Sequence, residues 1–474
     1  MNTVVSSVAT EFWVETTLGE RAEYITSGSR DWSRYYADSG AIFIRTQDIN
    51  QNRLSLEEVA FVKLPEKVEG KRSLVRKGDL LITITGANVG KVAVVEAEIP
   101  EAYVSQSVCL VRLKDPSLAK FVHLQLTAKR GDKTTVESMA YGLGRPVLNL
   151  ENIRSAPIRV APAKVQTVIV AEIEKQFSRL DEAVANLKPV KANLKRYKAS
   201  VLKAAVEGRL TEDWRKQHPN VEPASKLLER ILAERRATWS GRGKYKEPAK
   251  SDTSNRWSLP AGWDWTSPDQ LSKPDTNAIC AGPFGTIFKA KDFRPVGVPI
   301  IFLRHVAPGR YLRHKPGFMD EKKWKELFEP YSVFGGELLV TKLGEPPGVC
   351  AIYPEGIGPA MVTPDVIKMS VNSAAILPKL MMHYLNSEIA RRFATGAAFG
   401  TTRLRVTLPI FREMPVPLPP RAEQEQIVAE VERRLSIIEE FEAALEANLT
   451  RAARLRQSIL GSAFSGQLIH QERN

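Results

Sequence analysis

Residues 86–91 read GANVGK, which resembles a phosphate-binding loop. A P-loop has the spacing Gly-x-x-x-x-Gly-Lys-Ser/Thr, because its backbone amides hold the phosphates and its hydroxyl binds Mg²⁺. Here only three residues separate the glycines, and Val92 follows Lys91. A related stretch at 344–349, GEPPGV, has no lysine. The sequence therefore favours a tight β-turn at these positions over a nucleotide site.

No other pattern in the chain predicts catalysis. The six histidines lack HExxH or HxxxH spacing, so no metal site is expected. The chain has no Gly-x-Ser-x-Gly elbow and no Asn/Asp-Pro-Pro-Tyr tetrapeptide of the kind expected in an amino-methyltransferase. Pro364 and Asp365 have no spaced Asp/Glu-x-Lys after them that would suggest a nuclease. We therefore predict a protein that is not an enzyme and has no catalytic residue, metal ion or cofactor of its own.

The chain is a tandem duplication with an offset of 258 residues. IVAEIEKQFS at 169–178 recurs as IVAEVERRLS at 427–436. GDLLITITG at 78–86 likewise lies over GELLVTKLG at 336–344. A repeat of this length predicts two structurally similar halves.

The chain is strongly basic. Its net charge of +14 points to a polyanionic partner, most simply nucleic acid. Charge alone leaves open that this is a soluble protein that happens to be basic.

The three cysteines form no pairing framework and no metal-ligand spacing. Cys109 lies over Ile367 and Cys350 over Val92, so we expect these thiols, with Cys280, to be packed in the core. This use of cysteine fits a reducing cytoplasm. The N-terminus lacks a charged region followed by an apolar stretch, and no run of eighteen apolar residues occurs. A cytoplasmic protein is therefore expected.

Each copy begins with short β-type runs broken by Gly, Pro, Asn and Asp, which is typical of a β-rich α+β domain. The runs are AIFIRT, DLLITIT, KVAVVE and SVCLVRL in the first copy, and PIIFLR, ELLVTK and VCAIY in the second. Helices near 118–130 and 377–394 are expected to pack on the sheets. We place the two domains at 1–157 and 259–414.

Each copy ends in a long helix, within a central helical region at 158–216 and a distal one at 415–474. Apolar residues recur there at steps of three and four, as in a coiled-coil seam. Residues 217–258 have no counterpart in the second copy; they carry a possible short helix, SKLLERILAERRATW, followed by a basic, flexible linker.

Proline and glycine predict where the long helices begin and end. Pro162 and Pro420 precede them, and Gly208 and Gly466 stand where left-handed caps belong. Pro189 is expected to kink or split the first helix, because proline removes a backbone hydrogen bond.

Two similar domains tied together by antiparallel helices would have approximate two-fold symmetry, as duplex DNA does. The helices would then act as a ruler between two half-sites. A coiled coil whose only role is dimerisation is the alternative that periodicity leaves open.

These features resemble the specificity subunit of type I restriction–modification enzymes. In that family each variable domain is followed by a helix that opens with Pro-x-x-x-Gln and closes on Gly-x-Leu. LPPRAEQEQIVAEVE (418–432) and SILGSAFSGQLI (458–469) are similar to its distal conserved region, and VAPAKVQTVIVAEIE (160–174) and SVLKAAVEGRLTEDWR (200–215) to its central one. The first copy departs by having Val165 where the second has Glu423.

The resemblance implies that each domain is a target recognition domain reading one half of a bipartite double-stranded DNA sequence. The helices would set the unread spacer and dock two methyltransferase (modification) subunits, which restriction (motor and nuclease) subunits would join. S-adenosylmethionine, ATP and Mg²⁺ would belong to those partners. The seam residues taken as subunit interface are Ile173, Phe177, Leu180, Leu187, Leu194, Val431, Leu435, Ile438, Leu445 and Leu455.

The family does not fix its base-reading residues, so candidates rest on side-chain chemistry. Arg or Lys suits guanine, and Asn or Gln suits adenine, from loops and strand ends. A solvated or phosphate-contacting charge is the alternative for each candidate. The candidates are Arg45, Gln47, Asp48, Lys91, Arg145 and Asn149 in the first domain, and Arg304, His305, Lys342, Arg403 and Arg405 in the second.

Two other classes of protein remain open. A stand-alone architectural or regulatory DNA-binding protein would bind DNA tightly without partners, whereas a specificity subunit should bind weakly and salt-sensitively when alone. A methyltransferase or nuclease with degraded motifs would act without partners.

Overall fold

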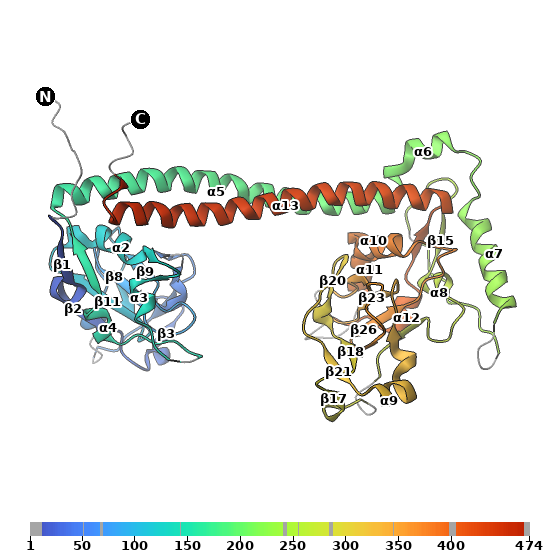
Figure 1. Ribbon diagram of the computed structural model, residues 1–474, viewed down its shortest axis with the longest axis horizontal. Helices are drawn as coiled ribbons and strands as arrows, with labels where there is room; N and C mark the ends of the chain where they lie inside the picture. Colours follow the sequence, from blue (N-terminus) through green and yellow to red (C-terminus); the bar gives the residue numbers. More distant parts are fainter. Residues whose placement is uncertain are drawn as a thin grey trace. The chain divides into compact units, whose positions relative to one another are not determined.

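The computed structural model describes residues 12–50, 52–66, 70–142, 144–239, 244–254, 256–283, 288–344, 346–397 and 404–468. The chain divides into two compact units, unit 1 (Met1–Pro189 with Leu445–Asn474) and unit 2 (Val190–Ala444). This division cuts both long helices, so each unit holds part of each (Figure 1). The domain boundaries drawn from the sequence follow the repeat instead and stay a prediction.

Unit 1 contains two four-stranded sheets that share a core. Leu81 and Leu110 of the first sheet pack with Ile42 and Val104 of the second. The first sheet is antiparallel, in the order β2 (Ala22–Ser27), β11 (Val108–Leu113), β8 (Leu80–Thr83), β9 (Val92–Val94). The second has one parallel pair, β10 with β4, in the order β10 (Ala102–Val104), β4 (Ala41–Ile44), β7 (Ala60–Val62), β3 (Tyr36–Ala37).

The other face of the first sheet is covered by helices. Side chains alternate along a strand, so Leu80 and Ile82 face away from Leu81 and pack with Val122 and Ile153. These last two belong to α2 (Ala119–Thr127) and α4 (Leu150–Arg154).

Unit 2 repeats this topology, which confirms the duplication. Its antiparallel sheet has the order β16 (Ile279–Ala281), β26 (Val366–Met369), β23 (Leu338–Thr341), β24 (Cys350–Ile352). Its second sheet gains an edge strand, in the order β17 (Phe293–Arg294), β21 (Gly317–Met319), β18 (Val298–Ile301), β25 (Ala360–Val362), β22 (Ser332–Val333). The predicted β-runs are therefore strands. The helix predicted near 118–130 is α2, and the one predicted near 377–394 is divided into α10 (Pro378–Asn386) and α11 (Glu388–Ala397).

Shorter elements complete the units. In unit 1 they are α1 (Leu18–Arg21), β5 (Ile49–Asn50), β6 (Arg53–Leu54), β12 (Lys129–Arg130), β13 (Lys133–Thr134) and α3 (Thr135–Ser138). In unit 2 they are α6 (Glu212–Gln217), α7 (Ala224–Ala237), α8 (Pro268–Leu271), β19 (Val306–Ala307), β20 (Arg310–Tyr311), α9 (Glu321–Lys323) and α12 (Leu408–Arg412).

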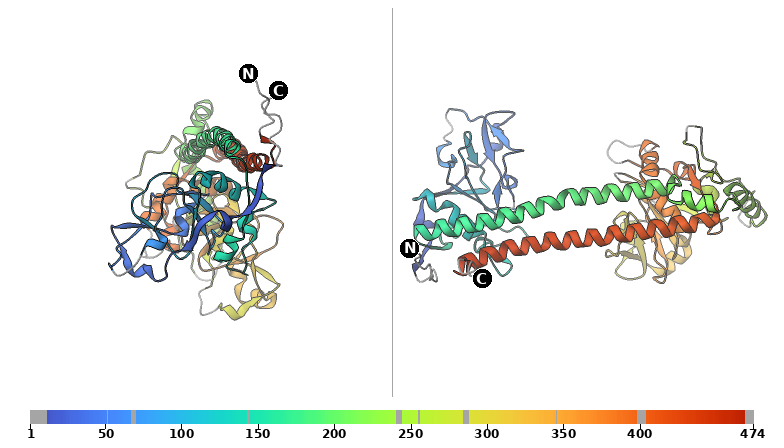
Figure 2. Two further views of the ribbon diagram at one scale, coloured as in Figure 1. Left: turned by 90° about the vertical axis from the view of Figure 1, so that its left-hand side faces the viewer. Right: turned by 90° about the horizontal axis from the view of Figure 1, so that it is seen from above.

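The two long helices occupy identical positions in the repeat. They are α5 (Ala163–Val206) and α13 (Arg421–Phe464), drawn in green and red in Figures 1 and 2, where they run side by side in opposite directions. Gly208 and Gly466 follow them with φ angles of 72° and 82°, the left-handed conformation predicted for both. None of the helices in the described part of the chain is both long and apolar enough to span a bilayer.

Pro189 does not split α5, which continues as one helix through it. A proline removes one backbone hydrogen bond, and here apolar packing holds the helix in both units. In unit 1 Ile169 and Ile173 of α5 pack on Ile459 and Leu460 of α13.

The entry to each long helix is built in the same way in both units. β14 (Pro157–Val160) pairs with β1 (Val14–Thr17), and β27 (Val416–Leu418) pairs with β15 (Asp264–Thr266). The glutamine of each Pro-x-x-x-Gln phrase is buried and donates a hydrogen bond to a backbone carbonyl just before its helix. Gln166 Nε2 donates to the Ala161 carbonyl (2.6 Å), and Gln424 Nε2 to the Pro419 carbonyl (3.1 Å).

The segment expected to be a linker contributes to the core of unit 2. α7 confirms the possible short helix, and Ala224, Leu227, Leu228 and Ile231 on one of its faces are buried in the same cluster as Val201 of α5. A spacing of three and four residues places these four side chains together.

The three cysteines are buried and unpaired, as predicted. Burial raises the pKa of Cys280 to about 11 and raises those of Cys109 and Cys350 further, so these thiols stay protonated.

His383 of α10 makes unit 2 sensitive to acid. Burial lowers the pKa of His383 to about 4, below its ordinary value of 6.5. The unfolded chain binds this proton more readily, so the stability associated with neutral His383 is present above pH 6.5 and is lost as the pH falls towards 4. We expect a loss of roughly 2–3 kcal/mol by pH 4 from this residue. Denaturant unfolding of His383→Gln between pH 7 and 4 checks this: the variant should lose less stability than the wild type, and parallel curves would contradict it.

Candidate nucleic-acid interface

Three loops chosen from the sequence for DNA reading lie together in unit 1. Asn88 Nδ2 donates to the Thr46 carbonyl (3.3 Å), and Leu148 N donates to the Ile84 carbonyl (2.9 Å). These contacts join loops that are far apart in the chain. The described residues of these loops are 45–48, 86–91, 141–142 and 144–149.

The GANVGK stretch is one of these loops, and it is the tight turn that its sequence predicted. Gly86 and Gly90 have positive φ angles, 91° and 85°, which suit glycine. Gly90 N donates to the Thr83 carbonyl (2.9 Å), as Gly348 N does to the Thr341 carbonyl in the repeat (2.8 Å).

Two candidates in unit 1, Gln47 and Arg145, are exposed and reach solvent from these loops. Lys91 is partly buried, and its Nζ forms an ion pair with Glu137 (3.2 Å). Burial would raise the pKa of Glu137, but hydrogen bonds from Thr134 and Lys91 outweigh it and the pKa falls. Lys91 is therefore anchored to α3.

The remaining candidates of unit 1 have structural partners. Asp48 is buried, accepts a hydrogen bond from Arg45 N (2.7 Å), and is paired with the Arg45 guanidinium (3.3 Å). Asn149 caps α4 by accepting from Asn152 N (2.7 Å). Arg45 also donates to the Glu58 carbonyl (3.1 Å). These contacts give Arg45, Asp48 and Asn149 a role in shaping the loops.

In unit 2 the candidates also meet at one edge. Lys342 N donates to the Asp365 carbonyl (2.8 Å), and Val406 N to the Lys342 carbonyl (3.0 Å). The Arg405 guanidinium lies 3.9 Å from the Asp365 carboxylate. Arg304 is exposed and stacks on Phe302, next to a hollow that Asp365 also lines.

His305 is fully buried, and its Nδ1 accepts a hydrogen bond from Phe302 N (2.9 Å), so the structure gives it a role inside the loop. Burial lowers its pKa. Arg403 lies outside the described residues. Asp365 is not among the residues that the sequence predicts to contact DNA, because an isolated aspartate after a proline carries no local signal of base reading. Asp365 lies near Lys342 and Arg405, and this proximity becomes apparent only in the folded structure.

Most of the seam residues predicted as subunit interface pack against other residues of this chain. Ile173, Val431, Ile438 and Leu445 are buried. Phe177, Leu194 and Leu435 are partly buried against the same helix-pair cores, and Leu180 and Leu187 are partly buried on α5. Leu455, by contrast, is 49% exposed.

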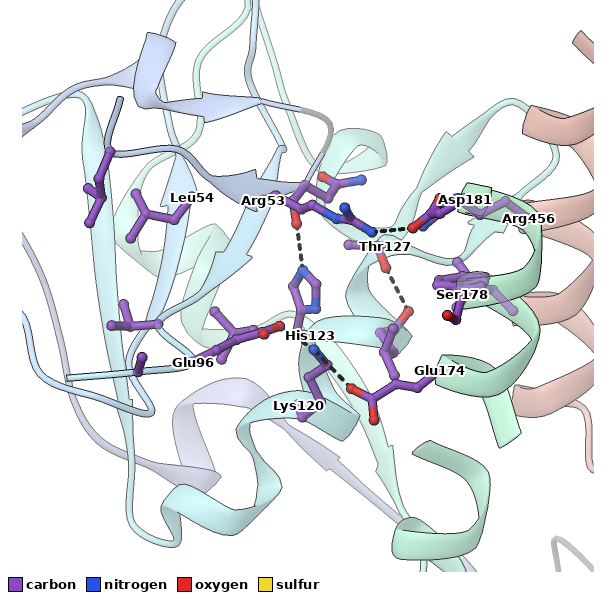
Figure 3. Close-up of a pocket in the computed structure, with 18 of the residues that line it drawn as sticks. Arg53, Leu54, Glu96, Lys120, His123, Thr127, Glu174, Ser178, Asp181 and Arg456 are labelled. Atoms are coloured by element: carbon purple, nitrogen blue, oxygen red, sulfur yellow. Dashed lines mark hydrogen bonds and ion pairs between the residues drawn. The ribbon is translucent and has the colours of Figure 1, made fainter. Parts of the chain in front are cut away.

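A cavity of about 640 Å³ in unit 1 lies between the β-rich domain and the long helices (Figure 3). Lys120 of α2 reaches both Glu96 and Glu174, at 3.2 Å from the latter. Asp181 of α5 forms ion pairs with Arg53 (2.7 Å) and with Arg456 of α13. Burial would raise the pKa of Asp181, but these two arginines outweigh it and the pKa is lowered.

Unit 2 has a hollow at the equivalent place, where Lys379 pairs with Glu432 (2.6 Å). Glu432 is the repeat partner of Glu174 at the 258 offset. In both units, therefore, a lysine from the β-rich domain pairs with a glutamate on a long helix.

Comparison with known proteins shows which family this chain resembles. Residues 11–194 match the model of the type I restriction modification DNA specificity domain. The EcoBI specificity subunit of Escherichia coli is 28% identical over 204 residues, which span 42% of this chain and 42% of that subunit. The EcoKI specificity subunit of Escherichia coli strain K12 is 23% identical over 93% of this chain and 85% of that subunit.

A solved structure from work on complex assembly and conformational transition of the type I R-M system shows the same fold. It has a TM-score of 0.56 at 17% identity and covers 96% of this chain and 98% of that one. The sequence is therefore similar to type I restriction–modification specificity subunits, and the fold is shared with the solved structure. Residues 11–194 match the DNA specificity domain of that family, and the predicted resemblance to its specificity subunits is confirmed.

Proposed function

We propose that this chain is the sequence-specific DNA-binding subunit of a type I restriction–modification complex and reads a bipartite target, one recognition domain per half-site. The observation that carries the proposal is the repeat of one sheet order in both units, with different side chains on the loops at the sheet edge. Identical scaffolds suit two similar half-site geometries, and different loops suit different sequences. The helices α5 and α13 set the unread spacer.

In this proposal the chain itself is not catalytic. Methyl transfer from S-adenosylmethionine is carried out by two methyltransferase subunits, and ATP- and Mg²⁺-dependent cleavage by restriction subunits, all in the cytoplasm. The basic charge of +14 favours DNA phosphates and makes binding by the isolated chain salt-dependent.

We infer that the methyltransferase subunits dock at two exposed apolar residues that are equivalent in the repeat. A buried seam residue can contact a partner only if the helix pair opens. We therefore expect the methyltransferase subunits to contact exposed residues of the helices. Tyr197 of α5 and Leu455 of α13 are repeat partners at the 258 offset and are 48% and 49% exposed. Large apolar side chains at such positions are typical of interfaces. Two equivalent docking points fit two identical subunits.

We expect Tyr197→Glu and Leu455→Glu each to reduce the number of bound methyltransferase subunits from two to one, and the double variant to bind none and to lose methylation. A buried charge at the contact is costly because it loses its hydration. Mass measurement of the purified complex counts the subunits.

Ala199→Glu and Ala453→Glu are matched controls, because both alanines are exposed on the same helices. They should leave two subunits bound. A double Tyr197→Glu, Leu455→Glu variant that still binds two subunits would overturn this assignment of the docking points.

A further inference from the structure

The repeat lets the same three backbone positions be compared in both units. In unit 1 they are Ile84, Ser107 and Val147. Ile84 N donates to the Ser107 carbonyl (2.9 Å), Leu148 N donates to the Ile84 carbonyl (2.9 Å), and Val147 forms a β-bridge with Thr85.

In unit 2 the positions 258 residues later are Lys342, Asp365 and Arg405. The corresponding hydrogen bonds are 2.8 Å (Lys342 N to the Asp365 carbonyl) and 3.0 Å (Val406 N to the Lys342 carbonyl), and Arg405 forms a β-bridge with Leu343. The backbone scaffold is therefore the same in the two units.

The side chains on this scaffold differ completely in chemistry. Unit 1 presents two aliphatic groups and a hydroxyl, and unit 2 presents two cations and a carboxylate. Positions that serve only the fold keep their character in a duplicated scaffold; Leu80 and Leu338, for example, are both buried leucines in equivalent strands. Ile84 is buried in the core of unit 1, and Lys342 is buried in unit 2. The change at the two more exposed positions, from Ser107 to Asp365 and from Val147 to Arg405, indicates that these side chains face different ligands in the two units.

The geometry of the unit 2 set favours a base edge over a phosphate. Arg405 and Asp365 are 43% and 41% exposed, so both charged groups are accessible. Their separation of 3.9 Å is a loose ion pair, which leaves hydrogen-bonding groups of both free for a ligand. A carboxylate repels phosphate, whereas base edges in the major groove offer donors as well as acceptors.

Lys342 lies behind this pair and is only 6% exposed. Burial, and then the neighbouring Arg405, lower the pKa of Lys342, while Asp365 acts in the opposite direction. Lys342 is therefore too deeply buried to reach DNA itself.

We propose that Arg405 and Asp365 together read one G·C base pair in the second half-site, Arg405 donating to guanine N7 and O6 and Asp365 accepting from the cytosine N4 amino group. This inference rests on the proposed function. A G·C pair presents two acceptors on the guanine and a donor on the cytosine in the major groove, which matches a guanidinium beside a carboxylate. Ile84, Ser107 and Val147 have no such charges, so the first half-site is read differently at the equivalent place.

The test is a map of methylated bases in DNA from cells that express the methyltransferase subunit with wild-type chain, Arg405→Ala or Asp365→Ala. We expect both variants to lose selectivity at one and the same G·C base pair of the second half-site, by roughly ten- to a hundredfold. The first half-site should stay unchanged, which also shows that the variant chain is folded. Arg392→Ala, which removes an exposed arginine paired with Glu388 on α11, is the control and should leave the motif intact.

Loss of selectivity at two different base pairs, or a uniform loss over all sequences, would overturn the inference, and the second result would indicate a phosphate contact. If an alanine variant abolishes all methylation, Asp365→Asn and Arg405→Lys replace it, and unchanged selectivity in both would again overturn the inference. A wild-type chain that yields no methylated motif would overturn the proposed function as well.

Discussion

Replacing Glu423 with alanine is expected to lower the free energy of unfolding of unit 2 by about 3 kcal/mol or more. The Glu423 carboxylate is fully buried at the start of α13 and pairs with the Arg215 guanidinium. It also accepts hydrogen bonds from Thr211 Oγ1 (2.6 Å) and Trp263 Nε1 (2.8 Å). Removing it leaves a largely buried cation and two donors without their acceptor, and each unsatisfied group carries a desolvation cost.

Urea unfolding followed by Trp fluorescence measures this loss. Glu425→Ala is the matched control, since Glu425 lies two residues further along α13 and pairs with Arg421 at the surface. That exposed pair should contribute less than about 1 kcal/mol. Equal losses of unfolding free energy in the two variants would show that Glu423 does not stabilise the contact between α13 and the segment after α5.

Inserting four helix-forming residues into both α5 and α13, beside Val190 and Leu445, is expected to abolish methylation of the original motif and to create a motif with a longer spacer. Four residues add about 6 Å and a rotation of about 40° beyond one full turn. With about 3.4 Å per base pair, the spacer should lengthen by about one to two base pairs. Both half-sites should stay the same, because the recognition loops are untouched.

The measurement is again a map of methylated bases. An insertion of the same length in the exposed turn at 355–358 controls for added chain and should leave the spacer unchanged. If the half-sites changed together with the spacer, or if the spacer stayed constant, α5 and α13 would not be the ruler between the half-sites.

The repeat made most of the fold predictable from the sequence. Pro162 and Gly208 mark the ends of α5, and Pro420 and Gly466 mark those of α13, because proline and left-handed glycine act through local backbone geometry. The continuation of α5 through Pro189 could not be predicted locally, since it depends on packing against α13 in both units.

The gathering of the candidate residues at one edge of each unit was predictable from the sequence, but their side-chain partners were not. Loops that follow β-runs lie at sheet edges, because strand ends expose their loops. The ion pair of Lys91 with Glu137 joins residues 46 positions apart, and the pair of Arg405 with Asp365 joins two loops that are also far apart in the chain. Such partners follow from tertiary structure, and only comparison of the two copies at the 258 offset would have singled out Asp365 beforehand.

The role of the α7 segment was underestimated for a different reason. Its charged composition resembles a linker, yet Leu227, Leu228 and Ile231 form an apolar face that unit 2 buries. The spacing was visible in the sequence, but what covers that face depends on the helix pair.

We propose that this chain directs methylation to one bipartite sequence. A map of modified bases in DNA from cells that express the methyltransferase subunit with and without this chain tests that proposal. We expect methylated adenine at one split motif, present only when the chain is expressed. Methylation at the same motif without the chain, or no motif although the two proteins form a soluble complex, would contradict it.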